Sequence, residues 1–139
     1  MSTTLKVVLD TNICIAILNQ TSQAARRRIR FLASSEFAVS SIVLFELYAG
    51  VHKSGRLEQN LRVLRSFVAR THVLEFSDDD AAEAGRLRSE LDGIGRPIGA
   101  YDLLIAGQAR ARSLKLATNN VSEFSQVQGL VVEDWLEPL

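Results

Sequence analysis

Short apolar runs recur along the chain, separated by stretches of mixed polarity. Val, Leu and Phe dominate these runs, which is typical of strands buried on both faces of a sheet. The pattern predicts strands at 5–9, 36–40, 72–76, 114–118 and 130–133.

Helical patterns fill the intervals between these runs. The clearest one places Leu57, Leu61, Leu64 and Val68 on one helical face. Helices are predicted at 12–19, at 23–32 after a Ser22 cap, around Glu46 after a Ser40 or Ser41 cap, at 56–70, from an Asp78 or Asp79 cap to Gly93, and at 100–112. Strands alternating with helices predict an α/β fold with a mostly parallel sheet.

Composition narrows the class of protein. A length of 139 residues predicts one domain over 1–139, and 47% hydrophobic with 23% charged residues is ordinary for a globular chain. The net charge of zero provides no overall basic field for nucleic acid or membranes. A single cysteine, Cys14, excludes an internal disulfide or a Cys-rich metal site. We find no signal peptide or membrane span, so we expect a cytoplasmic protein.

Three acidic residues stand beside apolar runs that should be core. Asp10 ends the first strand, Glu46 lies among Leu44, Phe45 and Leu47, and Asp102 opens the last predicted helix. Burying an unpaired carboxylate costs several kcal/mol. If the three converge, a divalent cation is the simplest remedy, and an all-oxygen set of ligands suits Mg²⁺ or Mn²⁺.

Each of these acids also has a purely structural interpretation. Asp10 could cap the next helix, Asp102 could be a favourable first-turn charge, and Glu46 could point to solvent. The two histidines, His52 and His72, lack ligand spacing and are expected at the surface or at a strand edge, which argues against zinc. Cys14 is expected to pack in the core.

Five segments together resemble a known family. They read "LDTN", "SSIVLFELYAG", "GRPIGAYDLLIAGQA", "LATNNVSEF" and "GLVVEDW", and they occur in the family's order between about Lys6 and Trp135. They are similar to the signature segments of PIN domains, specifically of VapC-type toxins. The resemblance implies a three-layer α/β/α fold with about five strands, and a metal-dependent endoribonuclease that is the toxin of a toxin–antitoxin pair.

The resemblance also assigns residues. It implies that Asp10, Glu46 and Asp102 are the catalytic acids and the metal ligands, with Mg²⁺ or Mn²⁺ as cofactor. Many PIN domains carry a fourth acid just after the fourth strand, where this chain has Asn119 and Asn120. Glu123 is either a replacement ligand or water-positioning residue, or else a helix cap or surface acid. The supporting residues are Thr11, Asn12, Thr118, Asn120 and Glu123.

Partners follow from the same resemblance. It implies a VapB-like antitoxin whose extended segment crosses a groove between 13–18 and 44–51, and a homodimer, for which unpaired apolar helical faces are a second reason. The RNA target could be tRNA, ribosomal RNA or mRNA, and we favour initiator tRNA. Candidate RNA contacts are Arg86, Arg88 and Arg96, with the run from Arg26 to Arg30 as a further candidate that is otherwise a solvated face.

Other functional classes remain as alternatives. A signalling receiver domain is also α/β with an Asp at a strand end, but it needs an acidic pair after the first strand and a Lys after the fifth. This chain has Thr11-Asn12 and Glu133-Asp134 there. A non-catalytic partner-binding domain would be favoured by loss of a core acid, and none is lost. A PIN-domain nuclease outside a toxin–antitoxin pair is the third alternative.

Overall fold

A five-stranded parallel sheet forms the centre of the molecule. The structure is a computed structural model that describes residues 4–138. Its strands lie in the order β3-β2-β1-β4-β5, and every neighbouring pair is parallel. The strands are β1 (Val7–Leu9), β2 (Phe37–Ser40), β3 (His72–Leu74), β4 (Lys115–Thr118) and β5 (Val132–Asp134).

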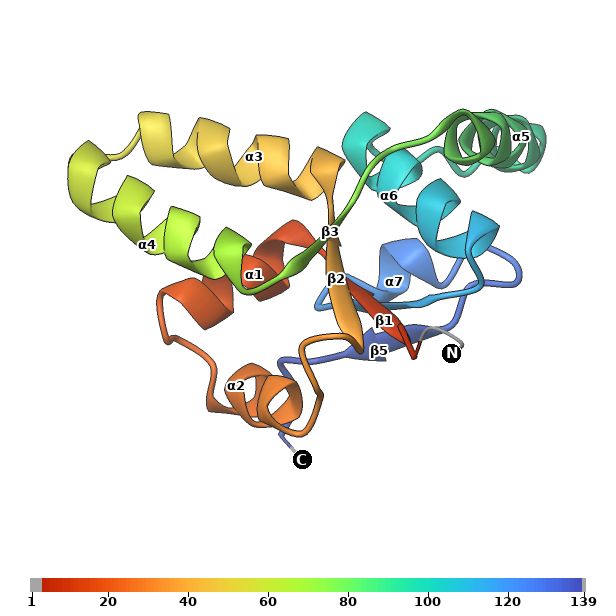
Figure 1. The fold of residues 1–139 in the computed structure, drawn as a ribbon. Helices are drawn as coiled ribbons and strands as arrows, with labels where there is room; N and C mark the ends of the chain where they lie inside the picture. The colour runs from red at the N-terminus through yellow and green to blue at the C-terminus, as the bar shows by residue number, and fades with distance from the viewer. Residues whose placement is uncertain (1–3, 139) are drawn as a thin grey trace.

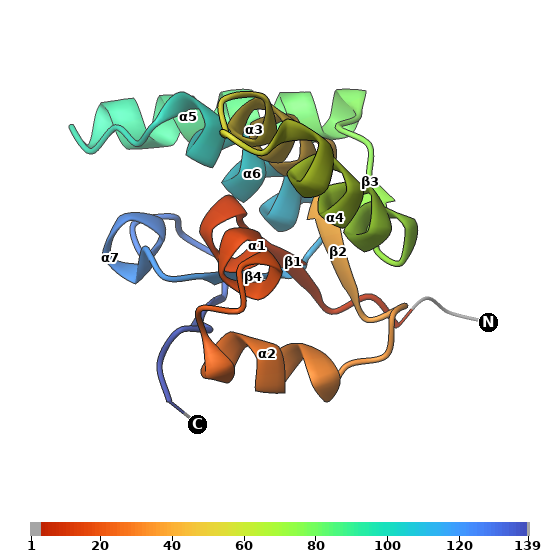
Figure 2. The same cartoon turned by 90° about the vertical axis from the view of Figure 1, so that its left-hand side faces the viewer.

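Helices connect these strands and cover the sheet. Figure 1 shows α1 and α2 on one side of the central strands and α6 and α7 on the other, which confirms the three-layer α/β/α prediction. The α3–α4 hairpin packs over α1, and α5 runs beside α6 (Figures 1 and 2). The helices are α1 (Thr11–Leu18), α2 (Gln23–Arg30), α3 (Ser41–His52), α4 (Leu57–Ala69), α5 (Asp78–Gly93), α6 (Ala100–Ala111) and α7 (Val121–Phe124).

The core lies between the central strands and the inner helical faces. All three residues of β1 and all four of β2 are buried, as both-face burial requires. Helices α5 and α6 approach closely at Gly107, where an added Cβ would lie 2.7 Å from Ala84. Within residues 4–138, no helix combines the length and apolar character needed to cross a bilayer.

Several features differ from the sequence prediction. Strand β1 begins at Val7 and not at residue 5, β3 ends at Leu74 and not at residue 76, and α2 ends at Arg30 and not at residue 32. Ser77, rather than Asp78 or Asp79, caps α5, and Asp80 completes a capping box with it. Strand β5 begins at Val132, two residues later than predicted. The short helix α7 was not predicted, because four residues are too few to show a helical period.

The predicted apolar face of α4 is mostly used within the chain. Leu64 is fully buried, Leu61 and Val68 are half-buried, and only Leu57 is exposed. This face packs against α1 and α3. It therefore provides little of the unpaired surface that motivated the homodimer prediction.

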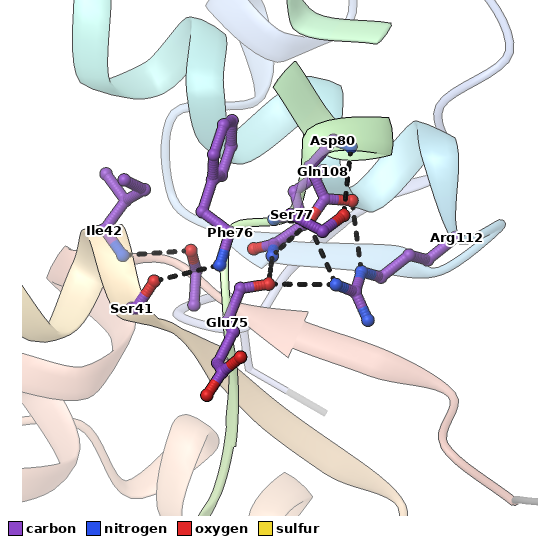
Figure 3. Close-up of polar contacts among 9 residues, drawn as sticks. Ser41, Ile42, Glu75, Phe76, Ser77, Asp80, Gln108 and Arg112 are labelled. Carbon is purple, nitrogen blue, oxygen red and sulfur yellow. Dashed lines mark hydrogen bonds and ion pairs between the residues drawn. The ribbon is translucent and has the colours of Figure 1, made fainter. Parts of the chain in front are cut away.

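A buried polar network fastens the end of α6 to the start of α5 (Figure 3). Asp80 is 1% exposed and accepts hydrogen bonds from Gln108 Nε2 at 2.9 Å and from Arg112 Nη2 at 2.9 Å. The same two side chains also donate to the Glu75 carbonyl. Asp80 also accepts a hydrogen bond from the Ser77 backbone N–H, so its carboxylate is satisfied within the fold.

Candidate active site

The predicted acids gather where the connections of the sheet change direction. From β1 the chain moves outward to β2 and β3, and it then returns to place β4 on the other side of β1. In parallel sheets the crevice at such a point, outside the carboxyl ends of the strands, is the usual ligand site. Asp10 follows β1 here and Thr118 ends β4, with the Asp10 N–H donating to the Ala117 carbonyl at 3.0 Å.

Asp10 is a buried carboxylate held by neutral donors. It caps α1, and its Oδ1 accepts a hydrogen bond from the Ile13 N–H at 3.0 Å. The Thr118 hydroxyl donates to its Oδ2. Burial raises the pKa of Asp10 despite these hydrogen bonds, and the charge of Glu46 adds to the increase. The structural interpretation of Asp10 as a helix cap is therefore correct, but the cap uses only one carboxylate oxygen.

Glu46 reaches the same end of the sheet from α3. The Thr11 hydroxyl donates to Glu46 Oε1 at 2.7 Å, which orients the carboxylate toward the start of α1. Asn12, the next residue, donates from Nδ2 to Asn119 Oδ1 at 3.3 Å. These two contacts join α1 to α3 and to the loop after β4. The half-buried Glu46 therefore does not simply point into solvent.

Asp102 on α6 forms a close acidic pair with Glu123 on α7. Burial is the main cause that raises the pKa of Asp102 to about 7, followed by a hydrogen bond with Glu123 and by its charge. The charges of Glu46 and Asp10 contribute further. Four acids from four separate segments thus influence one another electrostatically, more than a first-turn helix charge would explain.

Neutral groups fix the position of Glu123. Asn120 Nδ2 donates to its Oε2 at 2.6 Å, and the Gly99 N–H donates to its Oε1 at 3.3 Å. The Asn120 N–H donates to the Thr118 hydroxyl at 3.0 Å, so this loop is also connected to the group that holds Asp10. Asn120 and Thr118 therefore each form a hydrogen bond with one of the predicted acids or its neighbour, and their supporting role stays a prediction.

The arrangement of the four acids differs from a preassembled metal centre. Within residues 4–138, no three His, Cys, Asp or Glu side chains lie close enough together to hold a metal ion. Like charges repel, and each carboxylate is directed instead to a neutral donor or to a shared proton. No ion pair in the same part of the chain includes Asp10, Glu46, Asp102 or Glu123.

The three arginines predicted to contact RNA have different environments. Arg86 pairs with Glu83 at 3.0 Å and Arg88 with Asp92 at 3.4 Å, both within α5. Arg96 is exposed on the loop before α6 and forms no ion pair with the described residues. Of the three, Arg96 has the guanidinium that is free for a phosphate.

The remaining expectations concern the histidines and the cysteine. His52 and His72 are exposed, as predicted. Cys14 is fully buried, and burial raises the pKa of its thiol, so it packs as a small apolar residue. Sequence reasoning did not identify Asn119 and Gly99 as members of the site. The resemblance had placed Asn119 where a fourth acid is expected, and the only signal for Gly99 was its place three residues before Asp102.

The sequence also matches a known protein family. The model of the PIN domain matches residues 7–130. The chain belongs to the PIN-domain family. This PIN domain is 44% identical over 131 residues to a tRNA(fMet)-specific endonuclease VapC of Shigella flexneri, with 94% of this chain and 98% of the relative covered. It is 41% identical over 129 residues to Ribonuclease VapC2 of Rickettsia felis, with coverages of 92% and 96%.

Solved structures resemble this PIN domain over nearly its whole length. A DNA-bound VapBC from Salmonella typhimurium contains a chain with a TM-score of 0.89 and 40% identity, covering 94% of this chain and 98% of that one. VapBC2 from Rickettsia felis, bound to a DNA fragment from its promoter, gives a TM-score of 0.88 at 39% identity, with coverages of 94% and 99%.

Proposed function

We propose that this protein is a divalent-metal-dependent endoribonuclease and the toxin of a VapBC-type toxin–antitoxin pair. One observation carries the proposal: the charges of Glu123, Glu46 and Asp10, from three other segments, all act on Asp102, and no cationic side chain is paired to any of the four acids in residues 4–138. The names of the VapC relatives supply the substrate class. Initiator tRNA is the proposed target, because two relatives at 44% and 41% identity are tRNA(fMet)-specific endonucleases.

The donor set fits a hard divalent cation. Every candidate ligand is a carboxylate oxygen, which is the ligand that Mg²⁺ and Mn²⁺ prefer. Asp10, Glu46 and Asp102 would hold the ion, with Glu123 as a fourth ligand or as a water-positioning residue. A bound cation would supply an activated water and neutralise charge that develops on the phosphate.

The side chains of the protein itself have two further tasks. Thr11 and Thr118 orient Glu46 and Asp10, respectively, through their hydroxyl groups. Asn120 and the Gly99 N–H orient Glu123, whose carboxylate could accept a proton from the attacking water.

A groove between α1, α3 and α4 is the proposed antitoxin site. It has a volume of about 260 Å³ and is lined mainly by apolar side chains, with Glu46 among its lining residues. Its lining includes Ile15, Leu18, Leu47, Val51 and Val63, which overlaps the predicted segments 13–18 and 44–51. An antitoxin segment with an apolar side would fill the groove, and a basic side chain on it would pair with Glu46.

A homodimer is also part of the proposal, although α4 offers little of its interface. The measurement is the mass of the purified protein in solution, expected near twice 15.3 kDa. We expect a small antitoxin gene directly upstream, and co-expression with its product should yield a larger complex with reduced cleavage.

The decisive experiment is cleavage-site mapping on total RNA after induction of the protein. We expect growth arrest and new RNA ends within one tRNA species. A harmless chain that leaves RNA intact would contradict the proposal. RNA cleavage without any effect of the upstream protein would leave a PIN-domain nuclease outside a toxin–antitoxin pair.

A further inference from the structure

Two aromatic rings form an exposed pair on α3 and α6. The ring centroids of Phe45 and Tyr101 lie 5.6 Å apart, and the ring planes are tilted by 59°. Phe45 is 54% exposed and Tyr101 is 48% exposed. They are the only large hydrophobic residues of α3 and α6 that are exposed in the described structure. Aromatic rings usually bury most of their surface, so such a pair in solvent indicates an absent partner.

Both rings lie beside the acidic site. Phe45 directly precedes Glu46, and Tyr101 directly precedes Asp102. Consecutive side chains on a helix diverge by about 100°. The charge of Glu46 acts on Asp102, so the two acids that follow the rings in the sequence are near each other, while the rings themselves are exposed. The direct contact between the two rings makes one apolar surface that spans α3 and α6.

We propose that the Phe45–Tyr101 pair stacks an unpaired nucleobase of the RNA substrate next to the scissile phosphate. This inference rests on the proposed function and adds the substrate feature that is recognised. The four acids have no paired cationic side chain in residues 4–138, so an interaction that does not depend on charge would add to RNA binding beside them. Base–aromatic stacking is such an interaction, and it accepts any base.

The Phe45–Tyr101 pair, called the platform below, would also favour single-stranded over double-stranded RNA. In a duplex the base faces are covered by their neighbours, whereas loop nucleotides can turn a face outward. A rigid pair on two helices therefore favours cleavage in a single-stranded loop over cleavage in a stem. Arg96, which is exposed five residues before Tyr101, is a candidate contact for a flanking phosphate.

The two rings by themselves are too small to form the interface of the proposed homodimer. A stable interface buries about 800 Å² on each partner, whereas two half-exposed rings offer far less. The pair also borders the proposed reaction site, where an RNA strand must pass.

The test compares Phe45→Ala, Tyr101→Ala and the double variant with Phe31→Ala. Phe31 is 82% exposed, and it lies on the C-cap of α2, away from the acids. The alanine variants of Phe45 and Tyr101 are called the rim variants below. For a single-stranded substrate we expect each rim variant to raise KM roughly 10-fold, with a smaller change in kcat. Tyr101→Phe should recover most of the loss, because it keeps the ring, and Phe31→Ala should match the wild type.

A binding measurement separates this proposal from the proposed function. In an Asp10→Asn background, 2-aminopurine is placed beside the scissile position of the RNA, and stacking should quench its fluorescence. The double rim variant should abolish the quenching. Equal KM and equal quenching in the double variant would overturn the platform, even if the wild type cleaves RNA.

A change in oligomeric mass would overturn the platform in another way. If the double variant dissociates in sedimentation while KM and quenching stay normal, the rings belong to a contact between copies. Quenching that requires both rings in a protein that cleaves no RNA would contradict the proposed function and leave the platform standing.

Discussion

Asp10 and Asp80 are both buried, and their environments shift the pKa of the two carboxyl groups in opposite directions. Asp10 is 6% exposed and Asp80 is 1% exposed. Burial raises the pKa of Asp10, which has only neutral hydrogen-bond donors. At Asp80 burial also opposes the charge, but hydrogen bonds from Arg112, Ser77 and Gln108 outweigh it and hold the pKa below its usual range.

This contrast separates a structural carboxylate, Asp80, from a proposed catalytic one, Asp10. The charge of Asp80 is balanced within the protein by Arg112, and Figure 3 shows the contacts between them. Asp10 and its acidic neighbours are organised by the fold but not neutralised by it. Burial alone would rank the two residues alike, whereas the charge of their partners distinguishes them.

The largest expected effect is loss of cleavage in Asp10→Asn. Asn can still cap α1, so the fold should survive, while removal of the charge should lower the cleavage rate by at least about 100-fold. Glu46→Gln and Asp102→Asn should behave in the same way. The measurement is the rate of RNA cleavage, with circular dichroism to check folding.

Asp80→Asn is the matched control, since it changes a carboxylate that is equally buried. It should keep the cleavage rate per folded molecule. Near wild-type cleavage by Asp10→Asn, or selective loss of activity in folded Asp80→Asn, would remove the distinction between the two residues.

Removal of divalent cations by a chelator should affect the acids around Asp10 and leave the Asp80 network unchanged. Cleavage should stop in excess chelator and return with Mg²⁺ or Mn²⁺, because the four acids need a cation from outside. The thermal stability of the Asp80 network should not change. Undiminished cleavage after exhaustive chelation would contradict the proposed metal dependence.

Asp80→Ala should instead reduce stability. It leaves the Arg112 guanidinium and the Gln108 amide without their buried acceptor, and we expect a loss of about 2–3 kcal/mol in the free energy of unfolding. Urea denaturation measures this loss. A variant as stable as the wild type would show that the network contributes little to α5–α6 packing.

The smallest predicted effect concerns pH. The pKa of Asp102 rises from an ordinary 3.8 to about 7, so the folded state binds more protons between those values and becomes less stable as pH rises. In chelator, Asp102→Asn should therefore gain stability relative to the wild type between pH 5 and pH 8. Because Asp102 is partly exposed, we expect only about 1 kcal/mol.

Asp80 gives the opposite sign for the same measurement. Its lowered pKa adds stability that is present above about pH 4 and lost as pH falls further. The advantage of the wild type over Asp80→Asn should thus be constant from pH 5 to pH 8. An Asp102→Asn advantage that does not grow over this range would contradict the cause assigned to its raised pKa.

The sequence predicted the elements better than their junctions. Continuous apolar runs located all five strands, and burial on both faces explains this for β1 and β2. The expectation of burial on both faces was wrong for β3 and β5, which are edge strands and only partly buried. The Ser77 cap was missed since Asp78 and Asp79 are equally plausible caps, and only the reciprocal contact with Asp80 distinguishes Ser77. Helix α7 was too short for a periodic pattern.

In the candidate site, too, some features could be predicted from the sequence and others could not. Asp10, Glu46 and Asp102 could be proposed because an acid beside an apolar run is costly wherever it lies. The pairing of Glu123 with Asp102 depends on how α7 meets α6, which no local pattern specifies. The ring contact between Phe45 and Tyr101 joins residues on separate helices, so it too required the fold.

The central position of β1 has a consequence for the synthesis of the protein. Thr118, which holds Asp10, lies 108 residues further along the chain, and β1 gains its second neighbour only when β4 is made. Glu123 follows later still. A growing polypeptide therefore carries Asp10 long before the residues that hold it, and the site cannot assemble until β4 and Glu123 have been made. A chain truncated before Lys115 would lack β4, Thr118 and Glu123.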